Sequence, residues 1–286
     1  LRLAYIQLID PKYEKLARGN ALRHVVQYPP RGEIFDRNGE YLAQNRVCYD
    51  LMVIYRELPR EGFDTLQMLD LLGISRTKLE RALRNARMSP RIPYMVTNFI
   101  SSEVKLRFDE NDFPGFYTVY RTIRSYPRKI GGNLLGDVGE INERQLKMKR
   151  YADYRSGDYV GQSGVEKAYE EELRGKKGVK IMEKDTHGVV KGSYMDGMFD
   201  SLPEPGNYIV TTIDARLQAF TEELMRGKVG AAVAIEPSTG EILMMVSSPT
   251  FDPDEMVGRH RGNNYMKMLY NKRQPMFNRA VKAKYP

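Results

Sequence analysis

The fold is decided by one stretch near the start of the chain, Arg31-Gly32-Glu33-Ile34-Phe35-Asp36-Arg37-Asn38-Gly39. The apolar pair Ile34-Phe35 precedes a polar segment that ends in Asn38-Gly39, and a second apolar pair, Tyr41-Leu42, follows it. An Asn-Gly pair tolerates the positive φ angles of a type I′ turn, and such a turn between apolar pairs is typical of a β-hairpin. The stretch therefore predicts a tight hairpin that turns at residues 36–39.

Strands and helices are predicted on both sides of this hairpin. Residues 23–28 form an extended segment before it, and a further strand covers residues 47–55. From Phe63 to Phe108 apolar residues, among them Leu66, recur at three- and four-residue spacing, which predicts a helical insertion. Residues 116–120 read as a strand that resumes the sheet.

A helix start is predicted at Gly161-Gln162-Ser163-Gly164-Val165-Glu166. Ser163 followed three residues later by Glu166 is the pattern of a capping box, in which two side chains bind backbone N–H groups at the helix start. Gly175 predicts its end, and the acidic run Glu170-Glu171-Glu172 is expected on its exposed face. Residues 176–191 then read as two short strands around Thr186-His187-Gly188.

The pattern changes after a linker rich in glycine and proline at residues 192–206. Residues 208–213 read as a strand, and Asp214 is placed to cap a helix that turns Leu217, Phe220 and Leu224 inward. Residues 231–235 and 242–246 are apolar throughout, which predicts a hairpin buried on both faces of a sheet. A second, unfinished domain is therefore expected over residues 207–286.

Composition limits the function less than these motifs do. The chain has 286 residues, a single cysteine (Cys48) and a formal net charge of +8. One cysteine excludes an internal disulfide, and no stretch has the roughly 18 apolar residues that a membrane span needs. The positive charge leaves nucleic-acid binding as an alternative, but the basic residues are scattered among acidic ones and no recognition motif accompanies them.

No catalytic centre is evident within the chain. His24, His187 and His260 each lack an acidic or nucleophilic neighbour in the sequence, and no metal-ligand spacing occurs. Two Ser-x-x-Lys tetrads, Ser75 to Lys78 and Ser102 to Lys105, have the spacing that lets a lysine activate a serine. Both fall at predicted helix starts, where serine is a good N-cap, so we interpret them as structural.

Taken together, the motifs resemble those of one known family. Arg31 to Gly39 resembles the Arg-Gly-x-Ile-x-Asp-Arg-Asn-Gly motif of class B penicillin-binding proteins, and Gly161 to Glu166 resembles their Gly-x-x-Gly-x-Glu motif. Residues 211–218 and 234–243 look like the start of the family's transpeptidase domain, and residues 275–286 look like the approach to its active site. All occur in family order, and the overall pattern is most like the elongation type.

The resemblance implies an α+β fold. An elongated, non-catalytic pedestal domain is expected over residues 1–200, with a helical insertion at about residues 60–115. The first helix and β-hairpin of an α/β transpeptidase domain are expected over residues 207–286. The two motifs would pack together at the base of the pedestal, with Arg31 or Arg37 paired to Asp36 and Glu166, because guanidinium groups bind carboxylates through paired hydrogen bonds.

This cluster, comprising Arg31, Gly32, Asp36, Arg37, Asn38, Gly39, Gly161, Gly164 and Glu166, would fix the hinge that orients the transpeptidase domain. The resemblance further implies a serine-type D,D-transpeptidase that cross-links peptidoglycan stem peptides, binds penicillin and needs no cofactor or metal. The nucleophilic serine would lie just beyond Pro286, so the chain as given is expected to be inactive.

The remaining expectations concern partners and location. The pedestal would bind a membrane glycan polymerase and scaffold proteins of the elongation machinery, and no nucleic acid. A single-pass anchor outside this sequence would hold the domains at the outer side of the cell membrane, which is the periplasm where one exists. The alternative is an interaction module with no catalytic part of its own.

Overall fold

The computed structural model describes residues 22–59, 63–111, 113–184 and 190–284. They fall into two compact units, each built from three chain segments. The first holds Val47–Arg121, Lys176–Glu204 and the described part of Leu1–Pro29; the second holds Pro30–Arg46, Thr122–Gly175 and Pro205–Pro286. The second unit therefore combines two segments of the expected pedestal region, Pro30–Arg46 and Thr122–Gly175, with the segment that contains the expected transpeptidase residues.

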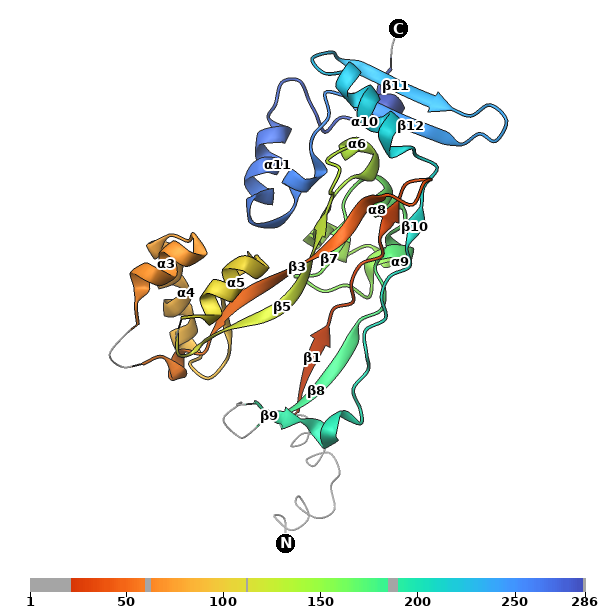
Figure 1. The fold of residues 1–286 in the computed structure, drawn as a ribbon. Coiled ribbons are helices and arrows are strands. Elements are labelled where there is room, and N and C mark those ends of the chain that lie inside the picture. The colour runs from red at the N-terminus through yellow and green to blue at the C-terminus, as the bar shows by residue number, and fades with distance from the viewer. Residues whose placement is uncertain (1–21, 60–62, 112, 185–189, 285–286) are drawn as a thin grey trace. The chain divides into compact units, whose positions relative to one another are not determined.

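The first unit contains the helical insertion. Helices α3 (Thr65–Leu72), α4 (Arg76–Met88) and α5 (Ser102–Asp109) accompany a sheet in which β3 (Tyr41–Val53) pairs with both β4 (Tyr94–Ile100) and β5 (Phe116–Ser125) (Figure 1). Their shared core includes fully buried side chains from a strand and from two helices, namely Leu51, Val53, Met68 and Leu79. Apolar spacing at three and four residues thus does form helices that pack on a sheet.

Strand β4 corrects the expectation that residues 63–108 are helical throughout. Its pairing with β3 is interrupted by register shifts, and Phe99 has a positive φ of 56°. Such bulges break the alternation of buried and exposed residues, so the sequence of β4 carries no clear strand period. Leu66 is also an exception, because its side chain is 76% exposed. Strand β3 begins at Tyr41, earlier than the predicted 47–55, but ends at Val53, and β5 continues to Ser125, beyond the predicted 116–120.

A three-stranded antiparallel sheet completes the first unit. Its order is β1 (Leu22–Gln27), β8 (Gly178–Lys184) and β9 (Val190–Ser193). The extended segment at 23–28 and the two strands within 176–191 are thereby confirmed. The predicted turn at Thr186-His187-Gly188 and the first residues of the chain lie outside the described residues.

The second unit contains the hairpin predicted at residues 36–39. Strand β2 (Ile34–Phe35) pairs antiparallel with the start of β3, and Gly39 has a φ of 81°. Asn38 has no positive φ, so the type I′ turn is wrong. The reason is the Asp36 carboxylate, which accepts hydrogen bonds from the backbone N–H groups of Asn38 and Glu40, both at 2.8 Å, and so shapes the turn itself.

Short elements follow Thr122 in the second unit. They are α6 (Gly132–Leu135), β6 (Val138–Glu140), α7 (Glu143–Leu146), β7 (Tyr159–Gly161), α8 (Gly164–Ala168) and α9 (Glu170–Leu173). Strands β6 and β7 pair antiparallel. The helix start predicted at Ser163 lies shortly after the end of β7 at Gly161. The single predicted helix is in fact two helical turns that meet at Tyr169.

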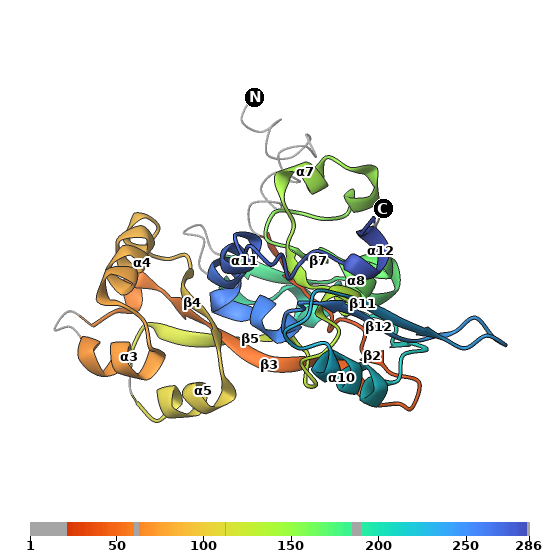
Figure 2. The ribbon, with the colours of Figure 1, turned by 90° about the horizontal axis from the view of Figure 1, so that it is seen from above.

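The rest of the second unit begins with β10 (Ile209–Val210), which is shorter than the predicted strand and pairs parallel with β2. Helix α10 (Ala215–Leu224) follows, then the hairpin of β11 (Gly230–Ile235) and β12 (Ile242–Ser248), and then α11 (Arg261–Leu269) and α12 (Arg279–Lys282). Helix α10 packs on β12, and α12 contacts both strands (Figure 2).

Helix α10 is capped as predicted, but its buried face differs. The Asp214 carboxylate accepts hydrogen bonds from the N–H groups of Arg216 and Leu217. Phe220 and Leu224, expected inside, are 62% and 53% exposed. Gln218 is buried instead, because its side-chain amide both donates to and accepts from the backbone of Met245 in β12. Val233 and Ile235 are exposed too, so this hairpin is not buried on both faces.

Candidate functional site

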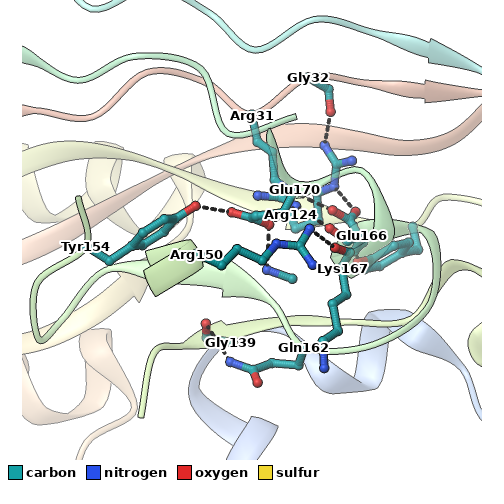
Figure 3. A network of polar contacts seen from close by, with 12 residues as sticks. Arg31, Gly32, Arg124, Gly139, Arg150, Tyr154, Gln162, Glu166, Lys167 and Glu170 are labelled. Atoms are coloured by element: carbon teal, nitrogen blue, oxygen red, sulfur yellow. Dashed lines mark hydrogen bonds and ion pairs between the residues drawn. The ribbon is translucent and has the colours of Figure 1, made fainter. Parts of the chain in front are cut away.

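Segments far apart in the sequence meet in a buried cluster of charges in the second unit. Arg31 lies just before β2, Arg124 lies near the end of β5, Glu166 lies in α8 and Glu170 begins α9 (Figure 3). Only Gln162 and Ser163 separate β7 from α8, so Glu166 lies close to the end of the strand. We call these four residues the charge cluster.

Glu166 is fully buried and is held by both arginines. Its Oε2 accepts a hydrogen bond of 2.6 Å from Arg31 Nε, and its Oε1 accepts one of 2.6 Å from Arg124 Nε. The hydroxyl of Tyr126 also donates to Oε1, at 3.2 Å. Arg124 Nη1 donates to the carbonyl of Gly32 at 2.8 Å, and thereby ties β5 to the Arg31 segment (Figure 3).

Glu170 receives the remaining hydrogen bonds of the charge cluster. Its Oε2 accepts from Arg31 Nη2 at 2.6 Å and from the N–H of Gly161 at 2.8 Å. Its Oε1 accepts from the Tyr154 hydroxyl at 2.5 Å. Arg31 therefore joins two carboxylates, and it also donates to the carbonyl of Glu166. Every carboxylate oxygen in the charge cluster has a donor, as buried charges require.

The charges of the cluster balance and shift one another's ionisation. Burial opposes the charged form of Glu166, but the charges of Arg124 and Arg31 outweigh it and hold the pKa of its carboxyl below the ordinary value. Burial likewise opposes the charged form of Arg31, yet Glu166 and Glu170 raise the pKa of its guanidinium. Burial, together with the charge of Glu166, raises the pKa of Tyr126. These directions keep the Glu166 carboxylate and the Arg31 guanidinium charged at neutral pH.

Glycines allow the backbone to close around these charges. A Cβ at Gly161 would lie 2.1 Å from the carbonyl oxygen of Glu166, and one at Gly164 would lie 2.4 Å from that of Leu134. Gly164 also has a φ of 58°. A Cβ at Gly32 would lie 1.9 Å from the carbonyl oxygen of Asn207. Only glycine fits these three contacts, because real side chains do not approach backbone that closely.

The hairpin end of the Arg31 motif does not reach the charge cluster. Among the described residues, the Asp36 carboxylate binds no arginine. It accepts from the N–H groups of Asn38, Glu40 and Ala215, and these bonds outweigh burial to lower its pKa. Arg37 instead forms an exposed ion pair with Glu241 at 3.3 Å. The structure thus brings Arg31 to Glu166 and places Asp36 and Arg37 elsewhere.

The expected capping box at Ser163 is wrong. The Ser163 hydroxyl donates to Asp137 at 2.8 Å and makes no cap hydrogen bond, while Glu166 turns inward to the arginines. The exposed face expected for Glu170 is also wrong, because Glu170 is 1% exposed. Arg124 and Glu170 were missed because neither belongs to a recognisable motif; only the four-residue spacing of Glu166 and Glu170 hints that they share a helix face.

The two Ser-x-x-Lys tetrads have structural roles. Ser75 caps α4 through the N–H of Lys78, whose amine donates to Thr97. Helix α5 is capped by Ser101, and the amine of Lys105 pairs with Asp109. The two lysine amines thus bind Thr97 and Asp109 rather than activate Ser75 and Ser102, so neither tetrad has the geometry of an activated nucleophile. Within the described ranges no three His, Cys, Asp or Glu side chains are placed to hold a metal ion.

Comparison with known protein families identifies two regions of the chain. The model of the penicillin-binding protein dimerisation domain matches residues 26–211, which contain the whole charge cluster. The chain belongs to the penicillin-binding proteins. The model of the penicillin-binding protein transpeptidase domain matches residues 230–286. The two matched regions follow the order in which the motifs occur.

Several curated relatives are peptidoglycan D,D-transpeptidases. The peptidoglycan D,D-transpeptidase MrdA of Acinetobacter baumannii is 31% identical over 100% of this chain and 43% of its own length. MrdA of Escherichia coli K12 is 30% identical over 96% of this chain and 44% of its own length. The chain thus spans less than half the length of the curated relatives it matches.

Solved structures agree with this placement. Penicillin-binding protein 2 from Helicobacter pylori is 25% identical over 92% of this chain and 50% of its own, with a TM-score of 0.65. A chain of a peptidoglycan synthase complex that coordinates polymerisation and crosslinking is 28% identical over 98% of this chain and 48% of its own, with a TM-score of 0.62. The expected resemblance to penicillin-binding protein 2 and the α+β fold class are confirmed. Among the residues that the structure describes, no helix is both long and apolar enough to cross a membrane.

Proposed function

We propose that this chain is the pedestal, with the first part of the transpeptidase domain, of a peptidoglycan D,D-transpeptidase active in cell elongation. The observation that carries the proposal is the charge cluster. It joins the Arg31 motif to the Glu166 motif inside the same compact unit as residues 205–286, and most of those residues match the transpeptidase domain.

A continuous set of backbone contacts connects the charge cluster with α10. Gly32 N–H donates at 2.8 Å to the carbonyl of Leu173, which ends the helical turn that Glu170 begins. Strand β2 then pairs with β10, and Arg37 N–H donates to the carbonyl of Ile213 at 2.9 Å. The Asp36 carboxylate accepts from Ala215 N–H, the first residue of α10. In our proposal this path makes the two motifs the support on which the transpeptidase domain is oriented.

The reaction assigned to the whole protein is acyl transfer by a serine. The serine hydroxyl attacks the carbonyl of the D-Ala-D-Ala bond of a stem peptide, D-Ala leaves, and the acyl group passes to an amine of a neighbouring stem. A beta-lactam acylates the same serine. The proposal places that serine beyond Pro286 and gives this chain the supporting role. No metal or organic cofactor enters the reaction.

The proposed partners and cellular location of this chain are those expected for the same family. The proposed partners are a membrane glycan polymerase and scaffold proteins. Partners of this kind are supported by two structures of similar fold, one from a peptidoglycan synthase complex and one from a complex with MreC. A chain from a complex of penicillin-binding protein 2 with MreC from H. pylori shares the fold, with a TM-score of 0.67 at 24% identity. The proposed location is the cell membrane, with a single-pass anchor and with these domains in the periplasm or otherwise outside the membrane.

Labelling with a fluorescent penicillin tests the division of roles. We expect no covalent labelling of residues 1–286, and labelling once the chain is extended through the family's Ser-x-x-Lys motif. Labelling of residues 1–286 would contradict the supporting role, and replacing Ser75 or Ser102 with alanine would locate the nucleophile. An extended chain that folds and still fails to label would instead favour an interaction module without transpeptidase activity.

A further inference from the structure

A cavity of about 530 Å³ lies in the second unit. Its walls include residues of α6, the end of β6, the residue before α7, the segment between β7 and α8, and residues of α11 and α12. The volume falls within the range of about 300–1,000 Å³ that is common for small-molecule sites. None of its lining residues belongs to the charge cluster.

One ion pair already lies in the cavity wall. Arg261 Nη2 donates to Asp137 Oδ2 at 2.6 Å, and the Ser163 hydroxyl donates to the other oxygen of the same carboxylate. Asp137 is only 2% exposed, so this pair is part of the protein's own packing. The Asp137 carboxylate is thus fully partnered, whereas Arg261 Nε is buried with no hydrogen-bond partner among the described residues.

Two further charged side chains line the cavity without such partners. Glu140 and Lys282 are exposed, and within the described part of the chain neither side chain forms an ion pair or hydrogen bond. The cavity therefore offers one anionic and one cationic group. A ligand that carries both an ammonium and a carboxylate would complement the two together.

Two asparagine amides in the wall each keep one free position. Asn133 Nδ2 donates to the carbonyl of Pro275 at 2.9 Å, which leaves its Oδ1 as an acceptor. Asn142 Oδ1 accepts from Gln145 N–H at 2.9 Å, which leaves its Nδ2 as a donor. A peptide group has one N–H donor and one carbonyl acceptor, so it matches this pair of free positions.

The remaining wall is apolar. Phe251, Tyr265 and Met276 line the cavity and pack around the buried Met256. We propose that the cavity binds a short peptide with free termini, with its carboxylate on Lys282, its ammonium on Glu140 and a peptide group between Asn133 and Asn142. A neutral sugar would leave both charges unused, and a polyanion would face the carboxylate of Glu140. This proposal stands on its own, apart from the proposed function.

Titration of the chain with the tripeptide Ala-Ala-Ala, followed by isothermal calorimetry, tests the site. We expect saturable binding, and a Kd about tenfold weaker, or about 1.4 kcal/mol, for Lys282→Ala and for Glu140→Gln. Lys284→Ala and Glu143→Gln, which change residues of the same charge outside the cavity lining, are expected to bind as the parent does.

The same peptide with an acetylated N-terminus and an amidated C-terminus is the matched ligand control. We expect its binding to be at least tenfold weaker, because it has neither terminal charge. The proposal is wrong if this blocked peptide binds as tightly as the free one. It is also wrong if Lys284→Ala weakens binding as much as Lys282→Ala does. A free peptide that shows no saturable binding up to about 10 mM would likewise contradict it, because a Kd weaker than this is too weak for a specific site.

Discussion

Glu166 is a buried carboxylate whose two oxygens are each held by an arginine. Removing such charges from water costs free energy that the ion pairs only partly return, so the intact charge cluster contributes little net stability. Removing one member of the cluster should destabilise the fold strongly, because an arginine or glutamate then remains buried without its partner. The cluster is therefore best understood as a device that fixes geometry, since each of its four carboxylate oxygens is held by a donor from a defined position.

Replacing Glu170 with alanine tests this at a single residue. The change removes the acceptor for Arg31 Nη2, for Gly161 N–H and for the Tyr154 hydroxyl. We expect the free energy of unfolding in urea to fall by about 3 kcal/mol. Glu171→Ala, an exposed neighbour in the same acidic run, should change it by less than about 0.5 kcal/mol. Equal effects for the two variants would show that Glu170 has no special role.

The lowered pKa of Glu166 predicts how its contribution depends on pH. A carboxyl whose pKa is lower in the folded than in the unfolded protein stabilises the fold above its unfolded pKa, and the stability is lost as pH falls through the folded one. The unfolded value is near 4.5. The difference in unfolding free energy between the parent and Glu166→Gln should therefore be constant near neutral pH and shrink below about pH 4.5. A difference that stays unchanged down to pH 3 would contradict the ionised state assigned to Glu166.

Elements with a strong local signal could be predicted from the sequence. The hairpin at Asn38-Gly39, the cap at Asp214 and the helix start after Ser163 depend on residues close together in the chain, and each appears in the structure. Strand β4 could not be predicted, because its bulged pairing with β3 is a tertiary effect. The direction of Glu166 was also beyond local rules, since two arginines distant in sequence compete with the cap for it.

Close packing between β7 and α8 gives a prediction for an element junction. A Cβ at Gly161 would meet the backbone of Glu166 at 2.1 Å, and no flexible side chain stands between them to yield. Gly161→Ala should therefore lower the free energy of unfolding by about 2 kcal/mol. In Gly262→Ala, within α11, the new Cβ meets nothing within 4 Å, and stability should be unchanged or slightly higher. Chemical denaturation of both variants measures this, and a Gly161→Ala protein as stable as the parent would refute the close contact.

At the scale of the whole molecule, the second unit gathers three separate segments of the chain. The family resemblance led to the expectation that Arg31 and Glu166 would meet, and the structure joins them across 135 positions of sequence. Arg124 was not foreseen, because a lone arginine in a strand carries no signal of burial or of a partner. The resemblance likewise did not indicate that Asp36 would hold the start of α10 and bind no arginine.

The pairing of Arg31 with Glu166 can be measured by a double-mutant cycle. Arg31→Gln, Glu166→Gln and the variant with both changes would be unfolded in urea at neutral pH, and their free energies of unfolding compared with that of the parent. Coupled buried charges should give a coupling free energy of about 1.5 kcal/mol or more. If the two changes instead add to within about 0.3 kcal/mol, the motifs do not hold each other, and the support we propose for the transpeptidase domain does not exist.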